Sequence, residues 1–242
     1  MNPLVGNSPA FVTTQWTVVL RAGGEHSPAA DEALEKLCRT YWYPLYVFIR
    51  RSGSTQHDAE DLTQAFFARL LEKGYLAGLD RTKGKFRSFL LAAFKHFTAN
   101  QRRDARAQKR GGGCTFISLD DHTVEQQYLR SAFADTTAER SFERQWATTL
   151  LEQVVTRLQA EFVAADKAAL FAKLKIFLTG DKHACGYADL AVKLGTTEAA
   201  LKMAVSRMRQ RYGELLRAEI ANTVSSAEEV DEELRSLFAA LS

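Results

Sequence analysis

The chain has 242 residues, 46% of them hydrophobic and 25% charged, and its 32 basic and 29 acidic side chains leave a net charge of +3. This composition is typical of a globular protein and excludes a chain that is disordered throughout, a collagen-like chain and a disulfide scaffold. No apolar run approaches the roughly 20 residues that a membrane span needs, and the N-terminus lacks a secretory signal pattern, so we expect a cytoplasmic protein without a membrane partner.

The residue types of common catalytic and metal sites are scattered. Cys38, Cys114 and Cys185 lie far apart without a C-x-x-C pair, which argues against a disulfide framework and against structural zinc. His183 lies close to Cys185, but two ligands do not make a site. The sequence has no phosphate-binding loop, no H-E-x-x-H and no nucleophile elbow. We therefore predict a protein that is not an enzyme and that needs no cofactor or metal.

The first expected helix follows an N-terminal extension, residues 1–30, that carries no recognisable pattern. Ser27 precedes Pro28, a residue favoured in the first turn of a helix, and Ser52-Gly53 ends the segment. Apolar residues recur every three or four positions at Leu34, Leu37, Tyr41, Leu45 and Phe48. We expect Pro44 to kink this helix.

A second helix begins at Thr55, with Asp58 three residues later as in a capping box, and we expect it to stop at Gly74. Its apolar stripe is Leu62, Phe66 and Leu70, and its first turns carry three acids, Asp58, Glu60 and Asp61. The plainest interpretation of these acids is a helix cap on a solvated face.

A third helix is expected from Lys85, after a loop over 75–84, to Gly111-Gly112-Gly113. The segment 81–110 holds ten basic residues and one acid, Asp104, so its net charge is 10 − 1 = +9. The first half of the helix is apolar and the second half is basic, and its phenylalanines are expected in the core. Such a charge concentration favours a polyanion such as nucleic acid as the partner, although a solvated helix face would have the same pattern.

Residues 114–137 show no sustained period and are expected to be a linker. A second helical domain is predicted over 138–217, with one apolar stripe at Leu150, Val154, Leu158 and Phe162 and another at Leu170, Leu174 and Phe177. The fold class is therefore all-α, with two small helical domains, 31–113 and 138–217, joined by the linker.

The segment 187–212 has the pattern of a helix-turn-helix. Leu190, Ala191 and Leu194 form a short first helix, Gly195 permits the turn, and Thr197 caps a second helix with a buried stripe at Leu201, Val205, Met208 and Tyr212. The open face would be a recognition helix for the major groove. A packing hairpin with a basic outer face is the alternative.

Residues 218–242 form an acidic extension that is expected to be helical. Val230, Leu234, Leu237 and Leu241 follow an acidic start. This extension would either pack on its neighbouring domain or act as an internal brake that covers basic surface.

With these segments in order, the chain resembles a bacterial RNA polymerase sigma factor of the sigma-70 family, extracytoplasmic-function type. Asp58-Ala59-Glu60-Asp61-Leu62-Thr63-Gln64 resembles the segment that binds the clamp of the polymerase β′ subunit. Phe86-Arg87-Ser88-Phe89-Leu90 through Arg110 resembles the promoter-melting helix, and Tyr187 to Tyr212 resembles the helix-turn-helix that reads the −35 element. Two features depart from the family: Ala65 replaces a common acid, and about 25 residues follow the recognition helix.

The resemblance implies three sets of binding residues and no catalytic ones. The polymerase-binding set is Asp58, Glu60, Asp61 and Gln64. The set for the −10 element and promoter melting is Lys83, Lys85, Lys95, His96, Asn100, Arg102, Arg103, Arg106 and Lys109. The −35 set is Thr197, Glu198, Ala199, Lys202, Ser206, Arg207 and Arg209. The implied partners are core polymerase, through its β′ clamp and β flap, and promoter DNA, and an anti-sigma factor or another regulator stays open.

Two other functions remain as alternatives. One is a helix-turn-helix transcriptional regulator that acts without core polymerase. The other is a metal-dependent nuclease with Asp58, Glu60 and Asp61 as ligands. Neighbouring carboxylates on a helix point in different directions, which disfavours coordination of one ion by all three.

Overall fold

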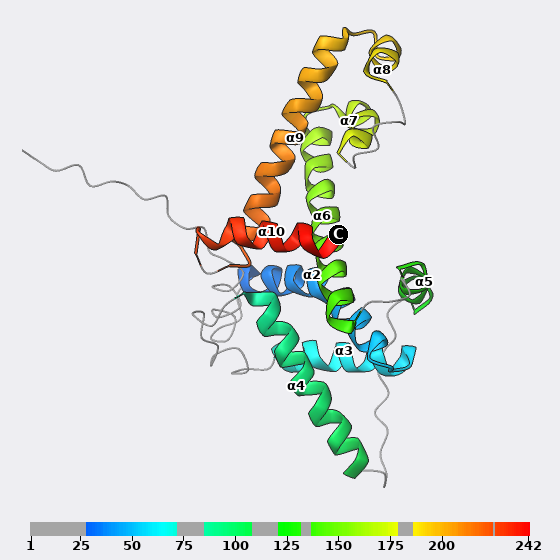
Figure 1. The fold of residues 1–242 in the computed structure, drawn as a ribbon, viewed down its shortest axis with the longest axis vertical. Coiled ribbons are helices and arrows are strands. Elements are labelled where there is room, and N and C mark those ends of the chain that lie inside the picture. The colour runs from blue at the N-terminus through cyan, green and yellow to red at the C-terminus, as the bar shows by residue number, and fades with distance from the viewer. Residues whose placement is uncertain (1–27, 72–84, 108–120, 132–136, 179–185, 225) are drawn as a thin grey trace, which may run out of the picture. The chain divides into compact units, whose positions relative to one another are not determined.

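The computed structural model describes residues 28–71, 85–107, 121–131, 137–178, 186–224 and 226–242, and every regular element in these ranges is a helix (Figure 1). The prediction of an all-α chain is confirmed. The helices are α2 (Pro28–Arg51), α3 (Gln56–Leu71), α4 (Phe86–Ala107), α5 (Asp121–Ser131), α6 (Ala138–Ala164), α7 (Ala168–Leu174), the 3₁₀ helix η2 (Lys175–Phe177), α8 (Tyr187–Lys193), α9 (Glu198–Ala221) and α10 (Glu229–Leu241).

The chain divides into two compact units, one formed by the residues up to Ala147 together with Ala221–Ser242, and the other by Thr148–Ile220. This division differs from the predicted boundaries. Helix α5, which lies in the expected linker, and the extension that contains α10 both belong to the first unit, whereas the boundary between the units falls inside α6.

The core of the first unit is built from the apolar stripes of α2, α3 and α4. The ring of Phe66 on α3 meets the edge of Phe94 on α4 at 5.0 Å, and the buried Tyr41 of α2 contacts Phe86 at 5.4 Å. Burial of such large side chains contributes roughly 1.5–3 kcal/mol each. The prediction that the phenylalanines of α4 are core residues is confirmed for Phe86, Phe94 and Phe97, while Phe89 is half-buried.

The ends of the first helices follow the expected local chemistry. Helix α2 begins at Pro28 and continues past Pro44, and Gly53 adopts a positive φ of 90° just after it ends. The backbone N–H of Asp58 donates to Oγ1 of Thr55 at 3.2 Å, and the Thr55 hydroxyl donates to the Asp58 carboxylate at 2.8 Å, so Thr55 caps α3 as predicted. The expected end of α3 at Gly74 and the glycines 111–113 lie outside the described residues.

Helix α5 lies within the segment that the sequence analysis treats as an irregular linker. It is held to α2 by polar contacts rather than by a long apolar stripe. Arg50 donates to both carboxylate oxygens of Glu125, at 2.5 and 3.2 Å, and the Tyr46 hydroxyl donates to the same carboxylate. Arg50 also lies over the Tyr128 ring, 4.9 Å from its centre. A helix stabilised in this way leaves little periodicity in its sequence.

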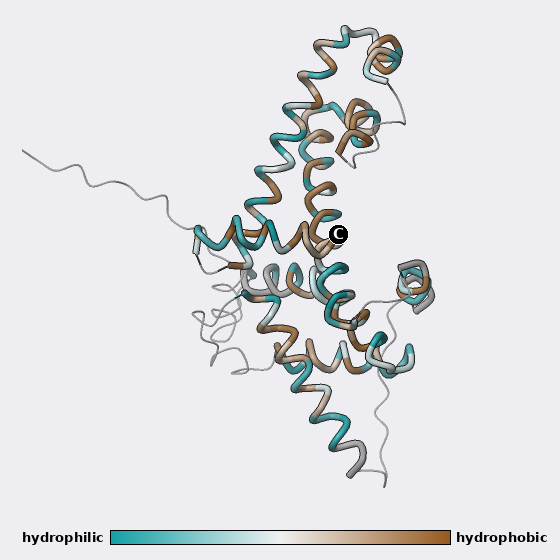
Figure 2. The backbone as a smooth tube through the Cα atoms, in the orientation of Figure 1, coloured by the Kyte–Doolittle hydropathy of each residue, from teal (hydrophilic) through white to brown (hydrophobic). Residues whose placement is uncertain are grey.

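The second unit contains most of α6 and α9 with α7, η2 and α8. The predicted stripe residues Leu150, Val154 and Leu158 are buried, and Phe162 is half-buried against Phe171 of α7 at 5.2 Å. Leu174 and Phe177 are also buried, as expected. Figure 2 shows hydrophobic turns interspersed with polar ones along both long helices, as expected for helices with one buried face.

Helix α10 packs in the first unit with Val230 and Leu237 buried and Leu234 and Leu241 partly buried, which confirms its predicted apolar stripe. Thr223, just before it, accepts a backbone hydrogen bond from Phe86 at the start of α4, at 3.3 Å. Among the helices that the structure describes, none is both long enough and apolar enough to cross a bilayer.

Candidate functional site

The acidic turns of α3 separate into exposed and buried carboxylates. Asp58 is exposed while it caps the helix, and the Asp61 side chain is 43% exposed, 3.4 Å from His57. Gln64 is partly exposed one turn further on. Glu60 is buried and accepts a hydrogen bond from Gln56 at 3.1 Å, so it does not lie on the exposed face that was predicted to bind a partner. The exposed face keeps Asp58, Asp61 and Gln64, at steps of three residues.

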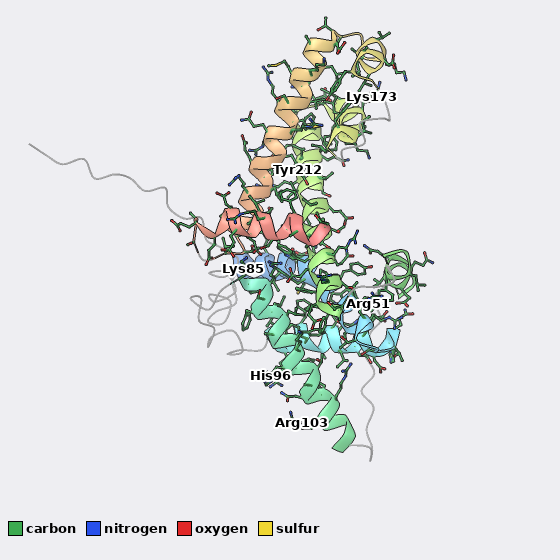
Figure 3. All side chains as sticks on the ribbon, viewed as in Figure 1. Arg51, Lys85, His96, Arg103, Lys173 and Tyr212 are labelled. Carbon is green, nitrogen blue, oxygen red and sulfur yellow. The ribbon has the colours of Figure 1, made fainter. Side chains whose placement is uncertain are left out.

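The basic residues of α4 fall into two groups along the helix. In the second half, His96, Asn100, Arg102 and Arg103 are exposed, and Figure 3 labels His96 and Arg103 on this part of the helix. Arg102 donates to the Ser54 hydroxyl at 3.1 Å. Figure 2 shows hydrophilic positions among the coloured turns of this half. Arg106 belongs to the last turn of α4, whereas Lys83 and Lys109 lie outside the described residues. The exposed polar groups suit contacts to phosphates and to unstacked bases.

In the first half of α4, and at Lys85 just before it, the cations are already paired with carboxylates. Lys85 contacts Glu232 and Glu233 of α10 at 3.2 and 3.0 Å, and Lys95 contacts Glu139 of α6 at 2.7 Å. Arg87 is buried between Glu233 and Glu143, with its guanidinium 4.4 Å from the centre of the Trp146 ring. The predicted DNA residues Lys85 and Lys95 therefore have intramolecular partners.

Sequence reasoning missed Arg87 and Glu233 as partners. A signal was present in the tail, because Glu233 comes three residues after Val230 and four before Leu237, and so lies within the apolar stripe of α10. A carboxylate at such a position is buried and must find a cation. The sequence offers no comparable signal that this cation is Arg87.

Helices α8 and α9 meet at the predicted corner. Gly195 has a φ of 62°, in the left-handed region, and the N–H of Ala200 donates to Oγ1 of Thr197 at 3.2 Å, which caps α9. The inward stripe is confirmed, with Leu201, Val205 and Met208 buried and Tyr212 half-buried. Because these residues face inward, the intervening positions of α9 face solvent.

The predicted recognition face is exposed but is not uniformly available. Thr197, Glu198, Ala199, Lys202, Ser206 and Arg207 are all exposed. Lys202 pairs with Glu198 at 2.6 Å and lies over the ring of Tyr187 at 5.7 Å, and its hydrogen bond to Glu198 raises the pKa of Lys202. Arg209 instead donates twice to the Phe177 carbonyl, at 3.1 and 2.7 Å, which ties it to the end of η2.

Two apolar side chains near this face were not predicted. Met203, next to Lys202, is 56% exposed, and Val192 at the end of α8 is 81% exposed. An exposed apolar group beside basic residues can contact the methyl group of thymine in the major groove. The sequence did contain a signal for their exposure, because both residues lie outside the apolar stripe that faces inward.

A pocket of about 360 Å³ lies among α6, α7 and α9. Its apolar lining includes Phe162, Leu174 and Met208, and Arg207 and Arg211 contribute charge to its wall. Arg211 pairs with Glu161 at 2.8 Å, and the hydrogen bond lowers the pKa of Glu161. The pocket can accept an apolar side chain with an acidic neighbour.

In the described part of the chain, no three His, Cys, Asp or Glu side chains group closely enough to hold a metal ion. The acids at 58–61 therefore do not form such a group. Comparison with protein-family models, curated proteins and solved structures finds no match for this chain.

Proposed function

We propose that this chain is an RNA polymerase sigma factor of the extracytoplasmic-function type, which directs core polymerase to promoters in the cytoplasm and leaves the chemistry to the polymerase. The observation that carries the proposal is the segregation of charge: an exposed acidic face on α3 and exposed basic faces on the second half of α4 and on α9. Each lies on a helix whose other face is buried, so its charge is presented to a partner rather than used in the core.

Each face has a role in this proposal. Asp58, Asp61 and Gln64 would contact the basic β′ clamp, where charge complementarity mainly speeds association and fixes register. The α4 face would bind the opened −10 strand, and α9 would read duplex DNA at −35. The apolar pocket of the second unit, with its basic wall, would receive the β flap.

The polymerase contact is tested with purified core enzyme from the source cell. Asp61→Asn should weaken binding to core about threefold to tenfold at low salt, and less at high salt, because the lost contact is an exposed charge. Glu32→Gln, an equal charge change at an exposed position of α2, is the matched control and should bind as the wild type does. Binding is measured by titrating labelled protein with core in fluorescence anisotropy.

A wild-type protein that never binds core would overturn the proposal. If such a protein still bound a promoter duplex tightly by itself, the regulator that acts without polymerase would replace it. DNA cleavage in the presence of Mg²⁺, lost in Asp61→Ala, would instead favour the nuclease.

A further inference from the structure

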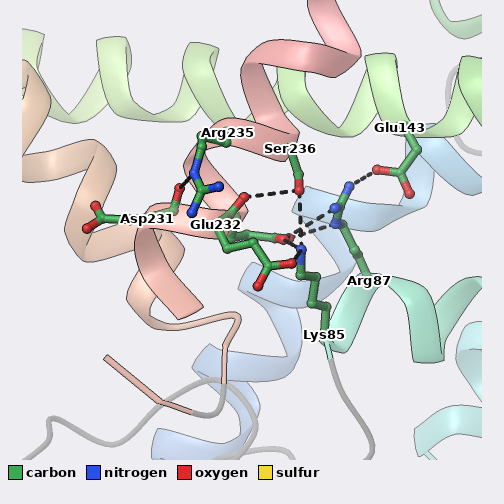
Figure 4. Close-up of polar contacts among 8 residues, drawn as sticks. Lys85, Arg87, Glu143, Asp231, Glu232, Arg235 and Ser236 are labelled. Atoms are coloured by element: carbon green, nitrogen blue, oxygen red, sulfur yellow. Dashed lines mark hydrogen bonds and ion pairs between the residues drawn. The ribbon is translucent and has the colours of Figure 1, made fainter. Parts of the chain in front are cut away.

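Helix α10 is anchored in the first unit by a buried ion pair. Nε of Arg87 lies 2.6 Å from Oε1 of Glu233 as an ion pair, and Nη2 donates a hydrogen bond to Oε2 at 3.2 Å. The Arg87 side chain, labelled in Figure 4, is 8% exposed, and that of Glu233 is 1% exposed. A pair so shielded from water is held firmly, because separating it would leave an uncompensated buried charge. This anchor, together with buried Val230 and Leu237, fixes α10 beside the start of α4.

The neighbouring acid has a different environment. Glu232 is 60% exposed, and its carboxylate reaches Lys85 at 3.2 Å, on the solvent side of the anchor (Figure 4). Lys85 also contacts Glu233 and donates to the Ser236 hydroxyl at 3.2 Å. The Lys85 side chain is 20% exposed, so the exchangeable member of the pair is Glu232, whose exposed carboxylate contributes little stability and can be replaced by another anion.

A second pair of this type lies nearly three turns further along α4. Lys95 pairs with Glu139 in the first turn of α6, and both side chains are about half exposed. Its ammonium also lies 5.4 Å from the centre of the Phe48 ring. The carboxylates of two different helices thus occupy both lysines at which the first half of α4 would contact DNA.

We propose that Glu232 and Glu139 are internal competitors of DNA phosphates for Lys85 and Lys95, so that the protein restrains its own DNA binding until phosphate displaces the two carboxylates. Carboxylate and phosphate oxygens accept the same ammonium donors, so one ligand excludes the other. Glu233 is the fixed anchor of this device, and Glu232 and Glu139 are its exchangeable parts. The inference rests on the proposed function for the role of the two lysines.

The experiment measures binding of the full-length protein to a fluorescein-labelled 20-nucleotide single-stranded DNA by anisotropy at fixed ionic strength. Glu232→Gln and Glu139→Gln should each bind about 1.5-fold to fivefold more tightly than the wild type, which corresponds to the loss of one exposed ion pair. Because the sites are independent, the double variant should show the product of the two gains. Circular dichroism melting checks that each variant is folded.

The matched lysine variants make the test specific. The gain from Glu232→Gln should vanish in a Lys85→Ala background and persist in Lys95→Ala, and the gain from Glu139→Gln should show the reverse pattern. Glu228→Gln is the control for net charge, because it makes the same change of charge at an exposed carboxylate next to α10. The partner of this carboxylate is the Ser226 hydroxyl rather than a lysine of the proposed DNA face. It should produce a smaller gain than Glu232→Gln.

Two results would overturn the inference: no gain in either glutamine variant, or gains that persist in the matching lysine background. The assay contains no polymerase, so failure of the proposed function appears separately, as absence of binding to core. If both lysine variants weaken DNA binding while the glutamine variants change nothing, the lysines contact DNA and only the competition is wrong.

Discussion

Individual side chains on α9 show how far a helical pattern predicts a binding face. Spacing correctly placed Lys202 and Arg207 outside the core, because buried stripe positions define the opposite face. Spacing did not predict that Arg209 would be tied to the Phe177 carbonyl, nor that Glu60 on α3 would be buried. Both depend on which other element packs there, and a single helix does not encode that.

Lys202 is the side chain of α9 whose removal should be most informative. If Lys202 contacts a base edge, Lys202→Ala should weaken binding to a promoter duplex by about 1–3 kcal/mol and relax the preference at one base pair. If it contacts phosphate, the variant should instead reduce the slope of the logarithm of the binding constant against the logarithm of salt concentration by about one. Part of the loss comes from Glu198, which loses its partner and then faces the DNA. Salt-dependent anisotropy measures both quantities.

Glu198→Gln in the Lys202→Ala background is the control, and it should recover part of the affinity. If Lys202→Ala binds as the wild type does at every salt concentration, Lys202 does not belong to the interface.

At the scale of elements, helices with caps and strong apolar stripes were predictable, and α5 was not. The starts of α2, α3 and α9 follow from local signals, namely Pro28, Thr55 and Thr197. Helix α9 continues to Ala221, beyond the segment 187–212 in which the pattern was recognised. Helix α5 depends on Glu125, whose partners lie 75 and 79 residues away in the sequence. No local pattern reports such a contact, because the helix gains its stability from tertiary packing.

The attachment of α5 to α2 should depend on pH. Burial alone would raise the pKa of Glu125, but hydrogen bonds from Arg50 and Tyr46 and the charge of Arg50 outweigh it and lower the pKa below the usual 4.5. The contact is therefore at full strength above about pH 4.5 and is lost as the pH falls through the lowered pKa. The nuclear Overhauser cross-peak between Tyr46 and Tyr128, whose rings are 6.3 Å apart, should weaken in this range.

The matched control is Glu125→Gln, in which the attachment should be weaker and independent of pH over the same range. A Tyr46–Tyr128 cross-peak in the wild type that does not weaken at any pH between 4.5 and the onset of acid unfolding would contradict this account.

At the scale of the whole molecule, the sequence indicated two helical units but did not predict the boundaries between them. The predicted linker contributes α5 to the first unit, and the C-terminal extension completes that unit through Glu233. Composition and periodicity describe each segment separately, and the Glu233–Arg87 pair joins segments 146 residues apart. The acidic tail, which was expected to pack on its neighbouring domain or to act as a brake, packs in the first unit instead, and its role as a brake remains a proposal.

Glu233→Ala should lower the free energy of unfolding of the first unit by about 3 kcal/mol, because Arg87 stays buried with one carboxylate fewer. Urea denaturation followed by the fluorescence of buried Trp146 measures the change. Glu232→Ala on the same helix should stay within about 0.5 kcal/mol of the wild type, because its side chain is exposed.

The double variant Arg87→Met, Glu233→Leu should recover part of the loss, because an apolar pair needs no charge compensation, whereas Glu143 loses its cation. Equal midpoints for Glu233→Ala and the wild type would show that the pair is not the anchor described here.

The length of chain between Arg87 and Glu233 also bears on biosynthesis. At about 5–20 residues per second, a ribosome needs about 7–30 s to add the intervening 146 residues. Throughout that interval the nascent protein carries the guanidinium of Arg87 without Glu233. Because the last segment of the first unit follows the second unit in the chain, the ribosome completes the second unit first. The first unit can therefore fold completely only after the whole of the second unit has been synthesised.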